Sequence, residues 1–532
     1  MLDNKIYQSL CSSKKYCSID TVDVLQIQDY LLNSNQVLQI ENLYEISNDC
    51  ITLRAKNERQ EDILLKIKHK KQQKNCENSI LNEQINILDD KSKIKQIEFQ
   101  DFLIQIFDPQ NYLSPNCFSY EELQTAIHRQ VTELQIHKKF RSLDQKTLEQ
   151  IGYYMVQCSN LLSMKLNFEN NMLDHTDANL IGEKIAQAKN LVNLELDFSY
   201  NKLGVSGSEK LCSQISKCSN LKILCLNLEN NQLTFHGAVS VGNGLAHFTK
   251  LTVLSLSLNS NMINQNGTPQ LANAISNYQD LKELYFSLNN NLIGQAGFIH
   301  ITQAIFKCLN LEKLQLFCEE CQIGESLSKF KSSAKQLMKL TYLDLNLGNN
   351  QLLCEGVSNI LEGIGFLQNL KHLNLNLSNN DFAEEGAIAI QENLSKLQNI
   401  QQLALAVEGN NLINNGVIII GKSFDKLSNL IELDFNSSEM DIDLQQLYDI
   451  FNKISNCSKL KSLHINYNIL SENYNVNNLE NVGQVVRKLK NLQFFYLEMD
   501  HVYAYKETIF KNLTLIRKNL RIVQAKITFN PF

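Results

Sequence analysis

The chain has 532 residues, of which 43% are hydrophobic and 20% are charged, a composition typical of a soluble folded protein with room for more than one domain. Its net charge of −6 gives no overall attraction to nucleic acid or to anionic lipid. The beginning of the sequence lacks the apolar core of a secretory signal, and no stretch reaches the roughly 18 apolar residues of a membrane-spanning helix. We therefore expect a protein of the cytoplasm, with the nucleus as an alternative, that binds neither membrane nor nucleic acid.

The N-terminal part of the chain differs in composition from the rest. Residues 1–151 contain no glycine and no repeat, and they are rich in Gln, Lys, Ile and Asn. Their apolar patterns predict strands near residues 51–56, 62–68 and 102–107, and helices near residues 77–88, 119–138 and 143–157. We predict an α+β N-terminal domain over residues 1–142, followed by a second domain over residues 143–532.

Two stretches of this segment resemble the small lobe of a protein kinase. ITLRAKNERQEDILLKIKHKK is similar to the second and third strands of that lobe, and ENSILNEQINIL is similar to the helix that follows them. The resemblance implies that Lys66 occupies the position of the phosphate-pairing lysine and that Glu83 occupies the position of its ion-pair partner.

Other kinase features are missing from the sequence. The segment Glu41–Cys50 has no glycine to form the loop over the phosphates, and Gln130 follows His128 and Arg129 where the family has its catalytic Asp. No D-F-G motif follows before the repeats begin. Two interpretations stay open: a degenerate kinase-like lobe with residual nucleotide binding, or an unrelated α+β cap.

From about residue 160 onward the sequence repeats itself. An apolar residue holds the same phase eleven times, and of the ten intervals nine are 30 residues long and one is 29. These residues are Leu161, Leu191, Leu221, Leu251, Leu281, Leu311, Leu340, Leu370, Ile400, Leu430 and Leu460. Such a period indicates stacked supersecondary units, and we predict about 12–13 of them. An array of this kind presents one long surface, which favours binding over chemistry in a pocket.

Each unit predicts a strand, a turn and a helix. In residues 221–250, apolar side chains alternate at Leu224, Leu226 and Leu228, which indicates a strand with one buried face. Asn231 follows at the turn, where a buried amide can bond to the backbone of its own unit and of the adjoining one. A glycine comes next, and apolar residues four positions apart then predict a short helix.

The repeat resembles the leucine-rich repeat family in its longer, ribonuclease-inhibitor-like form. That family has the strand motif L-x-x-L-x-L-x-x-N, whereas this chain has L-x-x-L-x-L-x-L-x-x-N, which is two residues longer. The resemblance covers residues 160–530 and implies an α/β solenoid, a horseshoe with a parallel sheet inside and helices outside. We expect the extra residues to lengthen the strand and turn slightly.

The sixth unit, which begins at Leu311, departs from the repeat pattern, and we predict a local distortion there. Cys321 replaces the asparagine and Leu327 replaces the glycine. The helix positions of the unit fall on Lys331 and Lys335, and the phase then loses one residue.

Cysteine spacing raises the question of a metal site. Cys318 and Cys321 form a C-x-x-C pair, which can bind metal or carry redox chemistry. Both fall on core positions of their unit, and no second pair or paired histidine lies near in sequence, so we predict core packing and no metal. Four more cysteines share one position before the next unit begins, where we expect them to be reduced and buried: Cys158, Cys218, Cys308 and Cys457.

Strand residues between the buried ones are expected to point to the inner surface of the array. Many are acidic or neutral, few are basic, and large aromatic side chains gather in the middle units. An acidic surface disfavours nucleic acid, and aromatic residues among polar neighbours are candidate anchors for a protein. The predicted partner-binding residues are Glu195, Asp197, Glu229, Glu283, Tyr285, Phe317, Tyr342 and Asp344.

The sequence therefore favours a non-enzymatic protein that binds a protein partner with a basic or mixed surface on its acidic inner face. The spacing of Ser, His, Asp and Glu residues indicates no catalytic set and no cofactor. Two alternatives stay open. One is a kinase-derived protein or pseudokinase that binds nucleotide through its N-terminal segment, and the other is a ribonuclease-inhibitor-like regulator.

Overall fold

A computed structural model of the chain describes residues 39–47, 50–56, 62–68, 84–88, 103–107, 116–117, 132–137, 143, 145–158, 160–412, 415–441, 444–468, 482, 484–500 and 524–530. Side chains are described from residue 132 onward. Contacts divide the chain into two compact units, one formed by Met1–Ile106 with Leu113–Gln124 and the other by Phe107–Tyr112 with Thr125–Phe532. Among the described residues, no helix combines the length and the apolar character needed to cross a bilayer.

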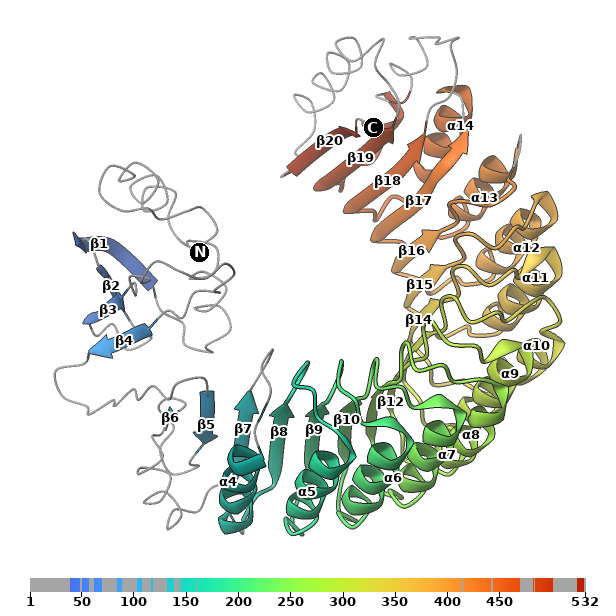
Figure 1. Cartoon of the computed structure of the whole chain (residues 1–532). Helices are drawn as coiled ribbons and strands as arrows, with labels where there is room; N and C mark the ends of the chain where they lie inside the picture. The colour runs from blue at the N-terminus through green and yellow to red at the C-terminus, as the bar shows by residue number, and fades with distance from the viewer. Residues whose placement is uncertain are drawn as a thin grey trace. The chain divides into compact units, whose positions relative to one another are not determined.

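The N-terminal unit contains a four-stranded antiparallel sheet in the order β1–β2–β3–β4 (Figure 1). Its strands are β1 (Gln39–Ser47), β2 (Cys50–Lys56), β3 (Asp62–Lys68) and β4 (Gln84–Leu88). Strand β5 (Leu103–Phe107) pairs in antiparallel orientation with β6 (Asn116–Cys117). The strands predicted near residues 51–56, 62–68 and 102–107 are thus confirmed by β2, β3 and β5.

The helix predicted near residues 77–88 is wrong in its second part. Strand β4 lies there and pairs with β3, and its sequence QINIL alternates polar and apolar residues as a strand requires. The helical interpretation took the same apolar residues as one face of a helix, an ambiguity that is common in short apolar runs.

The larger unit is built on an all-parallel sheet whose strands follow one another in chain order (Figure 1). Each residue pairs with the residue one period further on, as Leu224 does with Leu254. The strands are β7 (Glu133–His137), β8 (Ser163–Asn167), β9 (Asn193–Asp197), β10 (Ile223–Asn227), β11 (Val253–Ser257), β12 (Glu283–Ser287), β13 (Lys313–Phe317), β14 (Tyr342–Asn346), β15 (His372–Asn376), β16 (Gln402–Ala406), β17 (Glu432–Asp441), β18 (Ser462–Asn468), β19 (Phe494–Asp500) and β20 (Gln524–Asn530).

The first strand of this sheet corrects the prediction for residues 119–138. A helix was predicted there, but residues 133–137 form β7, which pairs in parallel with β8. Leu134 and Ile136 are buried in the phase of the later leucines, so the stacking of strands begins before residue 143. A pattern of two alternating apolar residues is too short to distinguish a strand from a helix by itself.

Helices alternate with the strands and pack on one another along the outer side of the sheet (Figure 1). They are α4 (Gln145–Gln157), α5 (His175–Ile185), α6 (Gly204–Ile215), α7 (Thr234–Leu245), α8 (Thr268–Ser276), α9 (Gly294–Ile305), α10 (Ser328–Ala334), α11 (Leu353–Ile364), α12 (Glu384–Leu394), α13 (Gly416–Phe424) and α14 (Leu444–Ile454). Helix α4 confirms the helix predicted near residues 143–157. Within this unit the sheet lines the inner side of the curve and the helices cover the outer side (Figure 1).

A ladder of buried asparagines links consecutive units. Asn261 is fully buried, and its Oδ1 accepts from the backbone N–H groups of Asn231 at 2.9 Å and of Leu233 at 3.3 Å. Its Nδ2 donates to the carbonyl oxygens of Leu228 (2.8 Å), Leu258 (3.1 Å) and Asn259 (3.0 Å). One amide therefore satisfies backbone groups of two units at the turn, where a buried unpaired group would cost about 1–3 kcal/mol.

A second set of hydrogen bonds lies in the part of the strand motif that is two residues longer than in the leucine-rich repeat family. Asn227, the last residue of β10, accepts the backbone N–H of Glu229 on its Oδ1 at 3.1 Å. Parallel backbone pairing continues beyond the strand, because Leu228 N–H donates to Ser257 O at 2.9 Å. The longer motif thus extends the backbone pairing between units before the asparagine turn, in line with the expectation of a longer strand and turn.

The distortion predicted in the sixth unit is confirmed. Helix α10 has 7 residues, whereas α9 and α11 have 12 each. The prediction that Lys331 and Lys335 take its helix positions is wrong, because Phe330 and Ala334 are the buried residues. This unit is one residue shorter than the others, and the missing residue falls before α10. The apolar face of the helix therefore comes one position earlier in the sequence. Phe330 fills the space with its ring centroid 5.9 Å from that of Phe298.

The last units change shape where the ladder asparagine is lost. Strand β17 has 10 residues and β18, β19 and β20 have 7 each, against 5 in β8–β16. In the sequence, Met440 and Leu470 stand where earlier units have asparagine. Strand β19 lies in an imperfect copy of the repeat that begins at Leu492, and β20 is a further strand that the repeat pattern missed.

Candidate binding surface on the inner face of the sheet

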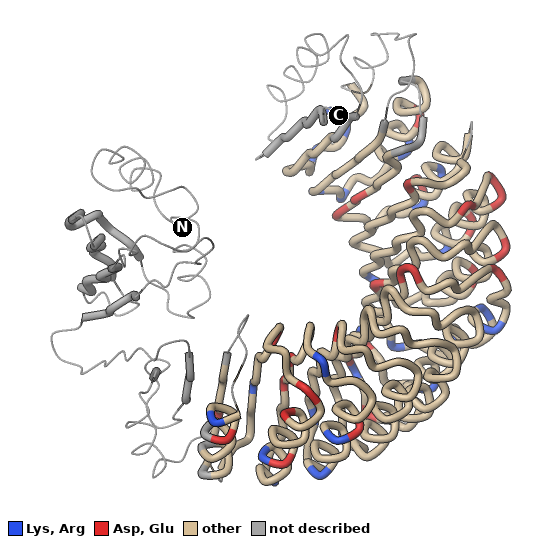
Figure 2. The backbone as a smooth tube through the Cα atoms, in the orientation of Figure 1, with Lys and Arg blue, Asp and Glu red and all other residues tan. Residues whose placement is uncertain are grey.

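The inner face consists of the first, third and fifth residues of each five-residue strand, which point away from the buried leucines. Because the strands are in register, these residues form three rows across the sheet. From β12 to β16 the first row is Glu283, Lys313, Tyr342, His372 and Gln402. The middle row is Tyr285, Gln315, Asp344, Asn374 and Ala404, and the third row is Ser287, Phe317, Asn346, Asn376 and Ala406. Charged positions are sparse along these strands (Figure 2).

The predicted acidic residues of the N-terminal strands already have partners within the sheet. Glu195 pairs with Lys165 at 2.5 Å across β8 and β9. Asp197 accepts the backbone N–H of Ser199 at 3.0 Å and its hydroxyl at 2.6 Å, so this carboxylate closes the turn after β9. Asp197 is therefore a structural residue as well as an inner-face charge, a role that the sequence analysis missed.

Glu229 also has partners on the sheet. Its Oε1 accepts the hydroxyl of Tyr200 at 2.6 Å, and its Oε2 accepts the amide of Asn259 at 3.4 Å. The hydrogen bond to Glu229 raises the pKa of the Tyr200 phenol above its usual range. In contrast, Glu283 on β12 is exposed at the edge of the central strands, where it can meet a partner directly.

Aromatic rings, an imidazole ring and one ammonium group form a patch at the centre of the inner face, which we call the central patch: Tyr285, Lys313, Phe317, Tyr342 and His372. The rings of Tyr285 and Phe317 meet edge to face with centroids 5.3 Å apart. The Nζ of Lys313 lies 5.0 Å from the centroid of Tyr342, and the ring of His372 stacks on the same tyrosine at 5.7 Å. The three aromatic residues were predicted from the sequence, whereas His372 was not, because its only signal is its place in the first row.

Asp344 lies beside the residues of the central patch and differs from the other predicted site residues because it is almost buried. Its exposed fraction is 9%, and its Oδ2 accepts the amide of Gln315 over a long 3.4 Å contact. Burial raises the pKa of Asp344, while hydrogen bonds from Gln315 and Asn374 and the charge of Lys313 lower it to a smaller extent. The carboxylate is thus only partly compensated in its ionised form.

The pair Cys318 and Cys321 lies in the core rather than on the inner face. Both residues are fully buried and neither forms a disulfide. The hydrogen bond with Cys321, together with burial, raises the pKa of Cys318 well above its usual range, which disfavours the thiolate that metals bind. Nowhere among the described residues do three or more His, Cys, Asp or Glu side chains come together in a way that could hold a metal ion.

The four cysteines that share one repeat position differ in burial, since Cys158 is half-buried and the other three are buried. The thiols of the buried three each donate to a carbonyl oxygen at the end of the helix in the preceding unit, as Cys308 does to Ile275 of α8 at 3.3 Å. Burial raises the pKa of Cys308 to about 12 and that of Cys218 to about 11. These residues are packing elements that also satisfy helix ends.

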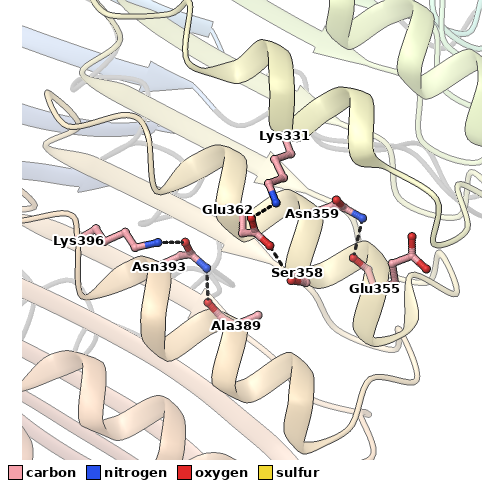
Figure 3. A network of polar contacts seen from close by, with 8 residues as sticks. All are labelled: Lys331, Glu355, Ser358, Asn359, Glu362, Ala389, Asn393 and Lys396. Carbon is pink, nitrogen blue, oxygen red and sulfur yellow. Dashed lines mark hydrogen bonds and ion pairs between the residues drawn. The ribbon is translucent and has the colours of Figure 1, made fainter.

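Polar contacts on the outer side join neighbouring helices (Figure 3). Lys331 of α10 forms an ion pair with Glu362 of α11, which also accepts the hydroxyl of Ser358 at 3.2 Å. On α12, the buried Asn393 donates to the carbonyl of Ala389 at 2.8 Å. The ion pair of Lys331 and Glu362 thus links α10 to α11, whereas the bonds of Ser358 and Asn393 each lie within one helix.

The N-terminal strands give little support to the nucleotide site that the kinase resemblance implies. Lys66 lies on β3, opposite Thr52 and Asn86 of the neighbouring strands. Glu83 lies outside the described residues, and the chain directly after it forms β4 instead of continuing a helix.

No known protein family matches the chain, and a search of curated proteins gives no match either. What the protein does is therefore inferred from its repeats and from the inner face itself.

Proposed function

We propose that the protein is a leucine-rich repeat protein of the ribonuclease-inhibitor-like type that binds a protein partner on its inner face and has no enzymatic activity of its own. The repeat motif, the strand-and-helix alternation and the asparagine ladder support the family. The single observation that carries the function is the central patch, because its aromatic rings and the nearly buried Asp344 lie together on the inner face of a parallel sheet.

The charges on either side of the central patch favour a partner with a basic or mixed surface. Glu229 follows β10 on one side of the patch, Glu283 lies on β12 beside Lys313, and Glu432 and Asp434 lie on β17 on the other side. A partner segment that places an apolar or planar group on the patch and cations on both sides would complement this arrangement.

A crosslinking experiment tests this proposal with the full chain in its native cell. The photoreactive residue p-benzoylphenylalanine replaces Gln315, at the centre of the patch, or Glu392, which lies on α12 in the outer layer. We expect a partner protein to crosslink from position 315 and not from position 392. The Tyr285→Ala and Phe317→Ala substitutions, introduced together, should lower the yield at position 315 at least several-fold. Equal yields from both positions, or no dependence on the two aromatic residues, would refute an inner-face partner.

Charge reversal gives an independent check on the acidic flank. Glu195→Lys with Glu283→Lys should weaken partner capture and make it less dependent on salt. Glu209→Lys, on an exposed position of α6, is the control and should leave capture unchanged. Asp197 is left out of this set because its replacement would also disturb the turn after β9.

Nucleotide binding by the N-terminal segment is a second candidate function. The order β1–β2–β3 of antiparallel strands, with Lys66 on the third, favours it, whereas β4 disfavours it. Titration with a fluorescent ATP analogue, with and without Mg²⁺, tests it: saturable binding lost on Lys66→Ala supports the candidate, and no binding removes it. A regulator of the ribonuclease-inhibitor kind is a narrower version of the first proposal, and inhibition assays against basic nucleases test it.

A further inference from the structure

We infer that Asp344, with Tyr285 on the other side of Gln315 in the same row of the sheet, binds the guanidinium group of an arginine carried by an extended segment of the partner. This inference rests on the proposed function, since it names the chemistry that the central patch recognises. It concerns a carboxylate that is almost buried on a surface built to face outward, an unusual place for an acidic side chain.

First, the ionised form of Asp344 is only partly compensated within the chain. The amide of Gln315 approaches it only to 3.4 Å, near the limit of a hydrogen bond, and the hydrogen bond from Asn374 does not offset the effect of burial on its pKa. Lys313 acts on it from a distance, because its ammonium group lies over the ring of Tyr342. A buried carboxylate with such weak compensation gains more from a cation than an exposed one does.

The second step is that Tyr285 provides a flat surface for a planar cation. Tyr285 on β12 pairs in register with Gln315 on β13, which pairs in turn with Asp344 on β14. The ring of Tyr342 is already in contact with Lys313 and His372. A guanidinium group that displaces the Gln315 amide would meet Asp344 with two N–H donors and would stack on an aromatic ring. The ammonium group of lysine lacks this planar pair of donors, which makes arginine the preferred ligand.

The third step is charge complementarity around the patch. Glu283 is exposed in the first row beside Lys313, and Glu319 follows β13, where its two oxygens accept the amides of Asn346 at 3.0 Å and of Asn349 at 3.3 Å. Basic residues next to the arginine in the partner segment would approach these carboxylates. An extended basic segment is therefore the occupant that this surface fits best.

Labelled peptides provide a direct test with the intact chain. The probes are the fluorescent peptide Lys-Ser-Gly-Arg-Gly-Ser-Lys and two peptides with citrulline or lysine in place of arginine, measured by fluorescence anisotropy at low salt. Citrulline keeps the shape of arginine but lacks its charge. We expect the arginine peptide to bind about 10- to 100-fold more tightly than the citrulline peptide, as suits a hydrogen bond between charged groups.

Variants assign this preference to Asp344. Asp344→Asn should bring the ratio between the arginine and citrulline peptides close to one, whereas Asp449→Asn, the same change on α14 in the outer helix layer, should leave it intact. Tyr285→Leu should lower the ratio several-fold without abolishing it. A circular dichroism melt of each variant verifies the fold.

The inference would be overturned if none of the peptides bound the unmodified protein, or if the arginine and citrulline peptides bound it equally well. It would also be overturned if Asp344→Asn left the ratio of their affinities unchanged. The crosslinking at position 315 does not depend on arginine. If crosslinking persists while the peptides are not distinguished, the arginine inference fails and the inner-face partner remains. If crosslinking fails as well, the proposed function fails with it.

Discussion

The thiol of Cys321 donates to the carbonyl oxygen of Leu288 at 3.1 Å, the bond that an asparagine amide makes in the neighbouring units. The comparison with Asn291 shows what the cysteine cannot do. The Oδ1 of Asn291 accepts the backbone N–H groups of Asn261 at 3.1 Å and of Ile263 at 2.9 Å, and a sulfur atom is a poor acceptor in that role. The ladder is therefore weakest at the sixth unit, next to the shortened helix α10.

Restoring the ladder should stabilise the protein. Cys321→Asn is expected to raise the free energy of unfolding by about 1–2 kcal/mol, because two hydrogen bonds to backbone N–H groups are gained. Urea unfolding monitored by circular dichroism measures the change. Cys321→Ala is the matched control and should be destabilising, since it removes the bond to Leu288 without adding an acceptor. An asparagine variant less stable than the natural protein would contradict this account.

Removing a regular ladder residue should have the opposite effect. Asn261→Ala leaves three carbonyl oxygens and two N–H groups without their side-chain partner, and we expect a loss of about 3 kcal/mol or more. Asn273→Ala, on an exposed position of α8, should stay within about 0.5 kcal/mol of the natural protein. Similar losses in the two variants, measured by urea unfolding, would refute the ladder as a major source of stability.

A third prediction concerns a strained residue at the start of α11. Leu353 has a φ of 51°, in the left-handed region, at the turn position where other units have Gly204, Gly294 and Gly324. Its side chain is 39% exposed, so little packing is lost on truncation. Leu353→Gly should raise the free energy of unfolding by about 0.5–1 kcal/mol, because the strain of a left-handed residue outweighs the entropy of glycine.

Thermal melting measures the effect of Leu353→Gly, and Leu353→Ala serves as its control. Alanine keeps the unfavourable φ and should therefore give no stabilisation. If alanine stabilises the protein as much as glycine does, relief of backbone strain is not the cause.

The last prediction follows from the raised pKa of Asp344. Because the pKa in the folded protein lies above that in the unfolded chain, burial of the ionised carboxylate lowers stability at every pH above the folded pKa. The penalty is relieved as the pH falls through the folded pKa and is gone below the unfolded one. Asp344→Asn should thus melt at a higher temperature than the natural protein at neutral pH, and the difference should shrink in acid.

Melting curves from about pH 3 to about pH 8 cover this range, since an ordinary aspartate has a pKa of roughly 4. The facing groups Lys313, His372, Tyr285 and Tyr342 are present in both proteins, so the difference between the two curves isolates Asp344. A variant that is less stable at neutral pH would mean that Asp344 supports the fold. A gain in stability together with lost arginine selectivity would mark a residue kept for binding.

The sequence by itself determined the repeat. The leucines at a fixed period, the asparagine at each turn and the irregular sixth unit all follow from local rules, because every unit solves the same burial problem in the same way. The same reasoning failed for residues 84–88 and 133–137, where short apolar runs fit a helix and a strand equally well and only pairing with β3 or β8 decided between them.

Only the tertiary structure decided which inner-face residues are engaged. Asp197 and Asp344 look alike in sequence, yet one closes a turn with Ser199 and the other lies nearly buried between Gln315 and Asn374 of the neighbouring strands. The contacts that make this difference reach across strands about 30 residues apart, such as Gln315 to Asp344 and Tyr342 to His372. Stacking brings these residues together, and the properties of each side chain then depend on which neighbours the sheet places beside it.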